Sequence, residues 1–425
     1  MPLETVFTMD TTSLKVGAGA TREVGSDLVA LGVKRVLVVT DANLATSETV
    51  AIVGKSLRDA SLDPVLYDQV RVEPTDQSFK AAVAFATTGN FDAYVAVGGG
   101  SVMDTAKAAN LYATYPADFL DYVNPPVGKG KPVPGRLKPL IAIPTTAGTG
   151  SETTGVAIFD FLELGAKTGI AHRALRPVLG IIDPDNTRTL PPMVAACSGL
   201  DILCHAIESL TAMPYNRRPA PESPTLRPAY QGANPISDIW AAKALEIVAK
   251  YLVRAMTDPD DREAREQMLL AAAYAGIGFG NAGVHLPHGM SYPVSGMVRD
   301  YQPLDYQVDH PIIPHGMSVI LNAPAVFRFT APANPQRHLY AASLMGVDIS
   351  GAADEDTGEI LANAVIGMMR ATGMPNGLSA VGYDEADVEK LAEGTLPQHR
   401  VTKLSPRPAD KAALEGLFRD AMRYW

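Results

Sequence analysis

Continuous apolar runs rich in β-branched residues alternate with helical patterns along the first half of the chain. The runs that we expect as strands are 36–40, 93–97, 140–143 and 179–182, with helices between them, for example over 43–60 and 76–87. Apolar runs without polar alternation are typical of strands that are covered on both faces, and such strands occur in parallel sheets. The alternation therefore predicts a doubly wound, Rossmann-like α/β domain, which we place at residues 1–190.

The pattern changes where the Pro191-Pro192 pair opens the second half of the chain. Long helical periodicities follow, and the helices that we expect are 193–210, 236–255, 261–276 and 359–372. We therefore predict an all-helical second domain over residues 191–425. One stretch, 213–235, contains six prolines, which is too many for a helix, so we expect an ordered surface excursion there.

The composition is that of a globular protein, and the charge balance excludes several partners. The 425 residues are 47% hydrophobic, and the formal charge is −10 without a basic cluster. Such a chain is not expected to bind nucleic acid or a membrane surface, and no apolar run approaches the roughly 18 residues of a spanning helix. Only two cysteines, Cys197 and Cys204, are present, which suits a reducing compartment. We expect a cytoplasmic protein, or one of the mitochondrial matrix if a presequence has been removed.

Two loops rich in glycine, threonine and serine follow expected strands. The first, GGGSVMDTAK at 98–107, opens an expected helix, and the second is PTTAGTGSE at 144–152. Glycines let a ligand approach the backbone closely, and a helix N-terminus offers free N–H groups to a phosphate. The first loop exceeds what a tight β–α turn needs, so we interpret it as a phosphate-binding loop. The second loop, taken alone, fits a solvated loop equally well.

Asp41 directly follows the expected strand over 36–40. A carboxylate at the C-terminal end of such a strand can accept hydrogen bonds from ribose hydroxyls and repel a 2′-phosphate. The alternative is that Asp41 caps the helix expected from residue 43, and both roles are compatible.

Four side chains in the second half have the chemistry of metal ligands. Asp201 and His205 are four residues apart, so they project from one face of a helix about one turn apart. His288 and His315 each precede a glycine in largely apolar sequence, where an unpartnered imidazole is costly to bury. The alternative is an exposed Asp–His pair and two satisfied core histidines. Taken together, three nitrogens and one oxygen favour a site for Fe²⁺ or Zn²⁺.

These elements occur together and in order, and with them the chain resembles the iron-containing alcohol dehydrogenase family over essentially its whole length. The resemblance implies an N-terminal NAD-binding α/β domain and a C-terminal helical, metal-binding domain of the dehydroquinate synthase-like type. It implies Fe²⁺ as the metal, with Zn²⁺ as the alternative, at Asp201, His205, His288 and His315. It implies dinucleotide contacts at Asp41, Gly98, Gly99, Gly100, Ser101, Asp104, Thr145, Thr146, Thr149 and Lys167.

One departure from the family pattern concerns proton transfer. Many family members carry a further histidine four residues after the first His-Gly histidine, whereas this chain has Tyr292 there and His285 three residues before His288. We expect His285 or Tyr292 to relay the proton, and packing around the site is the alternative for both.

Within the family, the likeness is greatest to transhydrogenases that act on hydroxy acids and oxo acids. Stretches that carry it include VRVEPTD at 70–76, RPAYQGANPISDIW at 227–240 and GIGFGNAGVH at 276–285. The implied reaction oxidises 4-hydroxybutyrate to succinate semialdehyde and reduces 2-oxoglutarate to 2-hydroxyglutarate through bound NAD. The alternatives are an NAD-dependent alcohol or 4-hydroxybutyrate dehydrogenase, a dehydroquinate synthase-type lyase, and an inactive binding protein.

Acidic substrates need a cation in the site. Guanidinium binds carboxylate in a two-pronged way, so Arg218 and Arg227 in the proline-rich excursion are the first candidates, and Arg400 and Lys403 are weaker ones. For any single one of them, a solvated surface position is the alternative. The family resemblance also implies a homo-oligomer, a dimer or larger.

Overall fold

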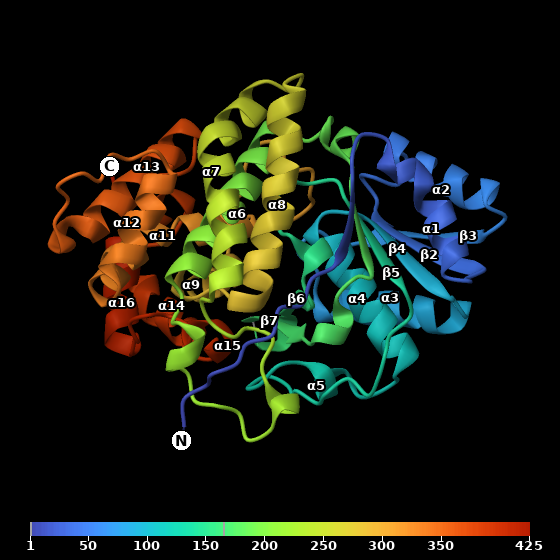
Figure 1. Ribbon diagram of the computed structural model, residues 1–425, viewed down its shortest axis with the longest axis horizontal. Helices are drawn as coiled ribbons and strands as arrows, with labels where there is room; N and C mark the ends of the chain where they lie inside the picture. Colours follow the sequence, from blue (N-terminus) through green and yellow to red (C-terminus); the bar gives the residue numbers. More distant parts are fainter. Residues whose placement is uncertain (1, 165) are drawn as a thin grey trace. The chain divides into compact units, whose positions relative to one another are not determined.

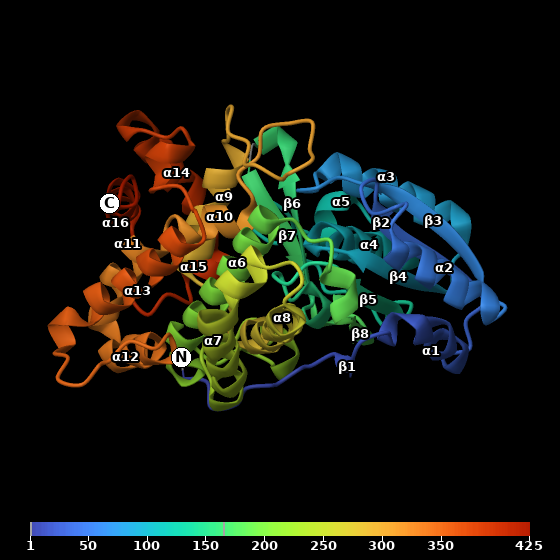
Figure 2. The same cartoon turned by 90° about the horizontal axis from the view of Figure 1, so that it is seen from above.

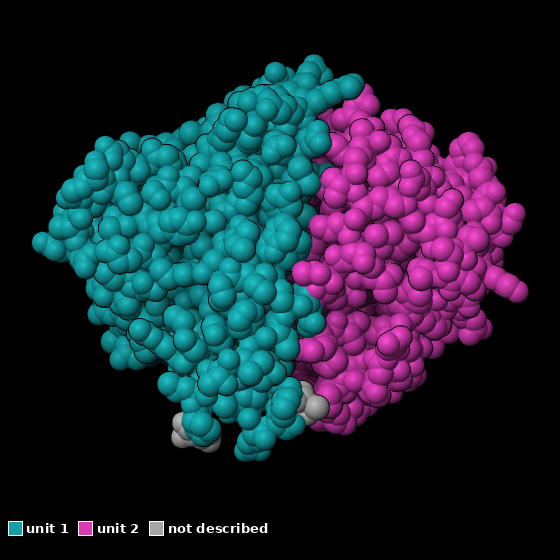
Figure 3. Space-filling view, viewed as in Figure 1, with its two compact units in different colours: residues 1–10, 191–425 teal, residues 11–190 magenta. Residues whose placement is uncertain are grey.

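The computed structural model describes residues 2–164 and 166–425, and the chain divides into two compact units (Figure 3). One unit is Thr11–Leu190, and the other joins the start of the chain, up to Asp10, to Pro191–Trp425. The expected first domain began at residue 1, so the first ten residues differ from that expectation. Their polar groups find partners in the helical unit: the N–H of Glu4 donates to the carbonyl of Arg218 at 2.8 Å, and that of Asp10 to Asn281 Oδ1 at 2.9 Å.

The α/β unit contains a six-stranded sheet in which every neighbouring pair of strands is parallel (Figures 1 and 2). The strand order is β1-β8-β5-β4-β2-β3, and a separate antiparallel pair is formed by β6 and β7. The strands are β1 (Ser13–Val16), β2 (Arg35–Asp41), β3 (Asp63–Val70), β4 (Ala93–Gly98), β5 (Leu140–Pro144), β6 (Val156–Phe161), β7 (Ala166–Ala171) and β8 (Leu179–Ile182).

Helices cover both faces of this sheet. They are α1 (Val24–Ala30), α2 (Glu48–Asp59), α3 (Asp76–Gly89), α4 (Gly100–Thr114) and the short α5 (Phe119–Tyr122). On one face, side chains of α1 and α2 pack on alternate residues of the central strands, and on the other face α3 and α4 pack on the residues in between. The continuous apolar runs are explained by this double burial, and the predicted parallel α/β class is confirmed.

The sheet has a point at which the strand order reverses. The chain runs from β2 outward to β3 and then returns to β4 on the other side of β2. Ligands of open α/β sheets bind beside the carboxyl ends of the strands at such a point. Asp41 ends β2 and Gly98 ends β4, so the two residues flank it.

Among the described residues, the second unit is built from α-helices joined by short 3-10 turns. The helices are α6 (Pro192–Thr211), α7 (Pro235–Thr257), α8 (Arg262–Ala282), α9 (Leu286–Gly296), α10 (His315–Ile320), α11 (Ala323–Thr330), α12 (Pro335–Leu344), α13 (Thr357–Ala371), α14 (Val388–Thr395), α15 (His399–Thr402) and α16 (Lys411–Asp420). Helix α6 lies at the centre, against α7, α8 and α10. It is long and apolar enough to cross a membrane, which the sequence analysis did not expect, but most of it is buried inside this unit.

The proline-rich segment 213–235 contains two short 3-10 turns, Tyr215–Arg217 and Pro224–Leu226, and is otherwise irregular up to the start of α7 at Pro235. Backbone hydrogen bonds fix both ends: the N–H of Met213 donates to the carbonyl of Leu404 at 2.7 Å, and that of Ala233 donates to the carbonyl of Met213 at 3.0 Å. The start of the segment is therefore attached to the helical unit close to α15.

Candidate active site

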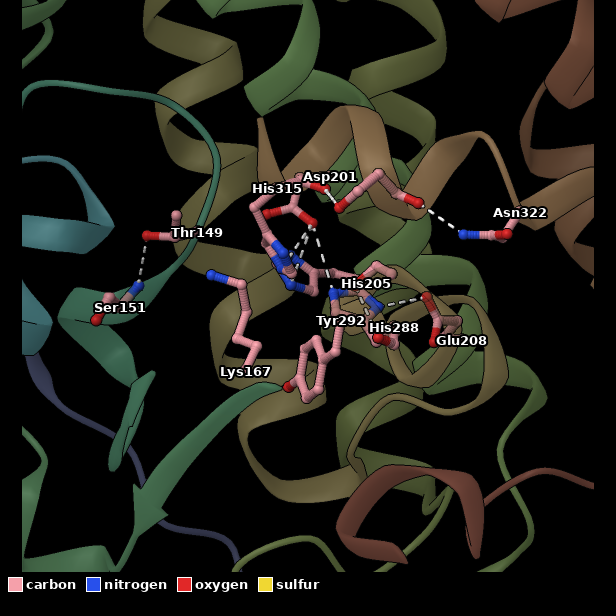
Figure 4. Close-up of polar contacts among 12 residues, drawn as sticks. Thr149, Ser151, Lys167, Asp201, His205, Glu208, His288, Tyr292, His315 and Asn322 are labelled. Carbon is pink, nitrogen blue, oxygen red and sulfur yellow. Dashed lines mark hydrogen bonds and ion pairs between the residues drawn. The ribbon is translucent and has the colours of Figure 1, made fainter. Parts of the chain in front are cut away.

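The carboxylate of Asp201 lies among three imidazole rings (Figure 4). Its Oδ1 atom is 3.6 Å from His205 Nε2, 3.5 Å from His288 Nε2 and 3.9 Å from His315 Nε2. Helix α6 supplies Asp201 and His205, α9 supplies His288, and His315 is the first residue of α10. The structure therefore brings together all four residues that the sequence analysis proposed as metal ligands.

Polar atoms of this cluster, on Asp201 and His288, are buried and unsatisfied among the described residues. Asp201 Oδ1 and His288 Nε2 are inaccessible to solvent, and neither atom has a hydrogen-bond partner within residues 2–164 and 166–425. Asp201, His288 and His315 each offer one ligand atom within 4.8 Å of the others, and the ring of His205 stacks on that of His288 with centroids 4.7 Å apart. Unsatisfied buried donors and acceptors are costly, and a divalent cation would satisfy them together. The donor set fits a first-row metal ion.

The glycines that follow His288 and His315 allow helices to pack closely at the site. A Cβ atom on Gly316 would lie 2.0 Å from the carbonyl oxygen of Cys197, so only glycine lets α10 approach α6 at this point. A Cβ atom on Gly289 would lie 2.7 Å from Thr402 Cγ2, so α15 approaches α9 in the same way. The two His-Gly elements therefore place their histidines by close packing of helices.

Glu208 binds His288 at the ring nitrogen that points away from Asp201. Its side chain is fully buried on α6, with Oε1 2.6 Å from His288 Nδ1 and Oε2 accepting the backbone N–H of His285 at 2.6 Å. A carboxylate on Nδ1 fixes the ring and leaves Nε2 free for a ligand. The sequence analysis gave Glu208 no role, although its position seven residues after Asp201 places it on the same helix face.

The charges of the cluster shift the pKa values of its members. Burial alone would raise the pKa of Asp201, but the surrounding histidines hold it well below its usual range. Burial lowers the pKa of His205 to about 3, whereas Glu208 and Asp201 overcome burial at His288 and raise its pKa to about 10. The negative charges of Asp201 and Glu208 favour a proton on His288. A cation at the centre of the cluster would take the place of that positive charge.

In the α/β unit, the two predicted cofactor loops lie against each other. A Cβ atom on Gly100 would lie 2.7 Å from Thr149 Cγ2, and one on Gly99 would lie 3.2 Å from Thr146 Oγ1. The N–H of Thr145 donates to the carbonyl of Gly98 at 3.1 Å. The glycines thus bring the threonine hydroxyls beside the N-terminus of α4, where backbone N–H groups can bind phosphate.

Three predicted cofactor residues have protein partners of their own. Asp104 accepts from Ser151 Oγ at 2.7 Å and from the N–H of Ile158 at 2.9 Å. Ser101 Oγ accepts from the N–H of Glu73 at 3.2 Å. Lys167 is buried and forms ion pairs with Glu73 at 2.6 Å and Asp160 at 3.0 Å. These contacts position the loops and the β6–β7 pair, so any contact with cofactor would be additional to them.

Models of two families of domains match the chain. The iron-containing alcohol dehydrogenase model matches residues 11–184, and the model of the C-terminal domain of the Fe-containing alcohol dehydrogenase family matches residues 229–422. The chain belongs to the iron-containing alcohol dehydrogenase family.

Individual relatives of this alcohol dehydrogenase family refine the comparison. The chain is 57% identical to a protein named hydroxyacid-oxoacid transhydrogenase, mitochondrial, from Xenopus tropicalis, over 99% of this chain and 92% of that one. Among solved structures, a 1,3-propanediol oxidoreductase is 27% identical, with a TM-score of 0.85 over 98% of this chain and 100% of that one. A sulfoacetaldehyde reductase from Bifidobacterium kashiwanohense in complex with NAD⁺ is 25% identical, with a TM-score of 0.80 over 99% of each chain.

The two residues considered for proton transfer have different surroundings. His285 is fully buried, Nε2 lies 2.9 Å from Thr211 Oγ1, and burial lowers its pKa to about 4. Thr211 already donates to the carbonyl of Ile207, so His285 donates to Thr211 and stays neutral. Tyr292 instead lies one turn beyond His288, with its ring centroid 6.5 Å from that of His315. These contacts favour Tyr292 over His285.

The arginines of the proline-rich segment are engaged with protein groups. Arg227 Nε donates to Glu4 Oε2 at 3.0 Å, which forms a largely buried ion pair. Arg218 Nη1 donates to the carbonyl of Tyr230 at 3.0 Å. Neither contact suits a residue that awaits a substrate carboxylate. The pairing of Arg227 could not be read from the sequence because Glu4 lies 223 residues away along the chain.

Proposed function

We propose that this protein is a hydroxyacid–oxoacid transhydrogenase. In the proposed reaction, 4-hydroxybutyrate is oxidised to succinate semialdehyde, the hydride passes to bound NAD, and 2-oxoglutarate then takes it to become 2-hydroxyglutarate. The observation that carries the proposal is the 57% identity to a transhydrogenase of that name over 99% of this chain. The enzyme is thus an oxidoreductase that acts on CH–OH groups.

Asp201, His205, His288 and His315 are proposed to hold the metal, as Fe²⁺ or alternatively Zn²⁺. The buried Asp201 Oδ1 and His288 Nε2 atoms, for which the described residues supply no hydrogen-bond partner, and the N₃O donor set support this assignment. The metal, when bound, supplies Lewis-acid polarisation of the substrate oxygen. The protein side chains orient that oxygen: Glu208 keeps His288 in one tautomer, and Tyr292 offers a hydroxyl one helical turn away.

The loops at 98–101 and 145–149 are proposed to bind the diphosphate of NAD, and Asp41 its adenosine ribose. Support comes from the place of both loops beside the reversal of strand order and from the NAD⁺ complex of a related structure. Because the cofactor carries the redox chemistry, the task of these loops is to bind and orient it.

The exchange assay without added NAD tests the proposed reaction. Purified protein is given 4-hydroxybutyrate and 2-oxoglutarate, and 2-hydroxyglutarate is measured by mass spectrometry. We expect many turnovers per chain, since a retained cofactor is reduced and reoxidised in turn. If product forms only after NAD is added in stoichiometric amounts, the protein is instead an NAD-dependent dehydrogenase, the function that the family models also allow.

Cofactor choice gives a second prediction. Asp41 Oδ1 accepts the N–H groups of Asn43 and Leu44 at 2.9 and 3.2 Å, so Asp41 closes the turn that follows β2. It is not the N-cap that the sequence analysis considered, because α2 begins at Glu48 with Ser47 as its cap. Asn at position 41 keeps an acceptor oxygen for this turn but removes the charge that repels a 2′-phosphate. We expect Asp41→Asn to tighten NADPH binding by about tenfold, equivalent to about 1.4 kcal/mol, as measured by fluorescence titration.

The matched control is Asp63→Asn. Asp63 begins β3 at the opposite end of the sheet and pairs with Arg35. This variant should bind NADPH as the wild type does. Equal NADPH affinity in Asp41→Asn and wild type would rule out the proposed role of Asp41.

Two further proposals rest on the relatives alone. The curated relatives are named mitochondrial, which supports the mitochondrial matrix as the compartment; a cytoplasmic location stays a prediction. The partners are small hydroxy and oxo acids, and a homo-oligomer stays a prediction.

A further inference from the structure

The guanidinium of Arg400 is surrounded by tyrosines, and no carboxylate of the described residues pairs with it. Arg400 lies on α15, where its Nη2 donates to Tyr292 Oη at 2.7 Å and its guanidinium carbon is 5.0 Å from the ring centroid of Tyr230. Its Nη1 atom is inaccessible to solvent and has no hydrogen-bond partner in the part of the chain that the structure describes. Among the described residues, no Asp or Glu forms an ion pair with it.

This arrangement is costly unless a ligand completes it. A guanidinium removed from water normally has a carboxylate partner, as Arg227 has in Glu4, and an unpaired one carries the full penalty of desolvation. The two tyrosines hold the guanidinium plane but supply no negative charge. The unused N–H groups on Nη1 are those of a fork that suits a carboxylate.

Aromatic side chains connect the guanidinium to the metal-binding side chains. Tyr292, to which it donates, has its ring centroid 6.5 Å from that of His315. Tyr230, on which it stacks, is 6.5 Å from Phe279, and Phe279 stacks on His205 at 3.9 Å.

The position of Arg400 is fixed by the packing that Gly289 allows. Helix α15 approaches α9 at the residue between His288 and Met290, because a side chain at Gly289 would collide with Thr402. The same close contact therefore holds Arg400 of α15 beside α9, the helix that carries His288. A second anchor is the carbonyl of Leu404, which holds the start of the proline-rich segment that carries Tyr230.

We propose that Arg400 binds the substrate carboxylate and thereby selects hydroxy and oxo acids over neutral alcohols. The inference rests on the proposed function, since it names the residue that recognises the acid at that same site. Arg400 is a specificity-determining residue: its fork holds the carboxylate while the hydroxyl or oxo oxygen is directed to the cluster around Asp201. Lysine at this position keeps the charge but loses the two-pronged geometry.

The test compares two substrates of equal length, 4-hydroxybutyrate and 1,4-butanediol, which replaces the carboxylate by a neutral CH₂OH group. Removing one partner of a buried charge pair is typically worth at least about 30-fold. We expect Arg400→Gln to lower kcat/KM for 4-hydroxybutyrate by at least about 30-fold and for 1,4-butanediol by less than about threefold. Arg400→Lys should lie between Arg400→Gln and the wild type.

The control is Arg407→Gln. Arg407 is an exposed arginine seven residues after Arg400; it stacks on Phe329 and donates to the carbonyl of Phe329 at 3.1 Å. The substitution therefore removes an equal charge from the same stretch of chain. This variant should keep both kcat/KM values. The thermal melting curve and NAD⁺ binding of each variant establish that it is folded.

A binding measurement gives a readout that is independent of turnover. Succinate, which has no hydroxyl to oxidise, is titrated calorimetrically into each protein, and Arg400→Gln should bind it at least about 30-fold more weakly than Arg407→Gln. Unchanged acid preference and unchanged succinate affinity in folded Arg400→Gln would overturn the assignment of Arg400. If the wild type itself shows no preference for the acid, the proposed function fails instead, whatever the variants do.

Discussion

Alanine in place of His288 is expected to abolish metal binding and to lower kcat by at least about 10³-fold. His288 Nε2 is one of three imidazole nitrogens around Asp201 Oδ1, and a metal bound there stabilises charge on the substrate oxygen by several kcal/mol. The change also leaves Glu208 buried without its histidine partner. Elemental analysis of the purified variant after exposure to Fe²⁺ gives the metal content, and the exchange assay gives kcat.

His310→Ala is the control for this variant. His310 lies outside the cluster and contacts the exposed Asp309 at 2.9 Å. It should keep one metal ion per chain and wild-type kcat. Full metal occupancy in a folded His288→Ala protein would contradict the ligand assignment, and activity retained without metal would contradict the proposed chemistry.

The α/β unit could be predicted where burial leaves a clear pattern. β2, β4, β5 and β8 are covered on both faces, so their sequences are continuous apolar runs and were expected within a few residues. β1 and β3 were missed because they lie at the edges of the sheet, where exposure admits polar residues. The antiparallel β6–β7 pair was also missed, because polar residues such as Asp160 and Lys167, which face each other in its register, interrupt the apolar runs.

The site could be predicted only in part. Helical spacing makes Asp201 and His205 neighbours, and the His-Gly elements indicate close packing, so the ligand set followed from local sequence. The partners of these residues are distant in sequence: Glu208 and His288 are 80 residues apart, and Arg227 and Glu4 are 223 apart. A sequence shows that an arginine is present but not whether the fold already neutralises it, which is why Arg227 was preferred to Arg400.

Gln in place of Glu208 is the second change with a large expected effect. Both carboxylate oxygens accept N–H groups, one from His288 Nδ1 and one from the backbone of His285. Glutamine has nearly the same shape, but it has one acceptor oxygen and an NH₂ group that would face one of these donors. We expect metal affinity to fall by about 10- to 100-fold, because the His288 ring loses its orientation and its negative partner.

The measurement is a titration of the Co²⁺-loaded protein with a chelator, followed by its visible absorption, since these bands report the geometry of the ligands as well as occupancy. Glu246→Gln is the control: Glu246 is an exposed residue of α7 whose pair with Lys243 is weak, so its affinity and spectrum should equal those of the wild type. A role of Glu208 in packing alone predicts a lower melting temperature with unchanged Co²⁺ bands. Altered bands together with weaker binding require that Glu208 acts through His288 on the metal.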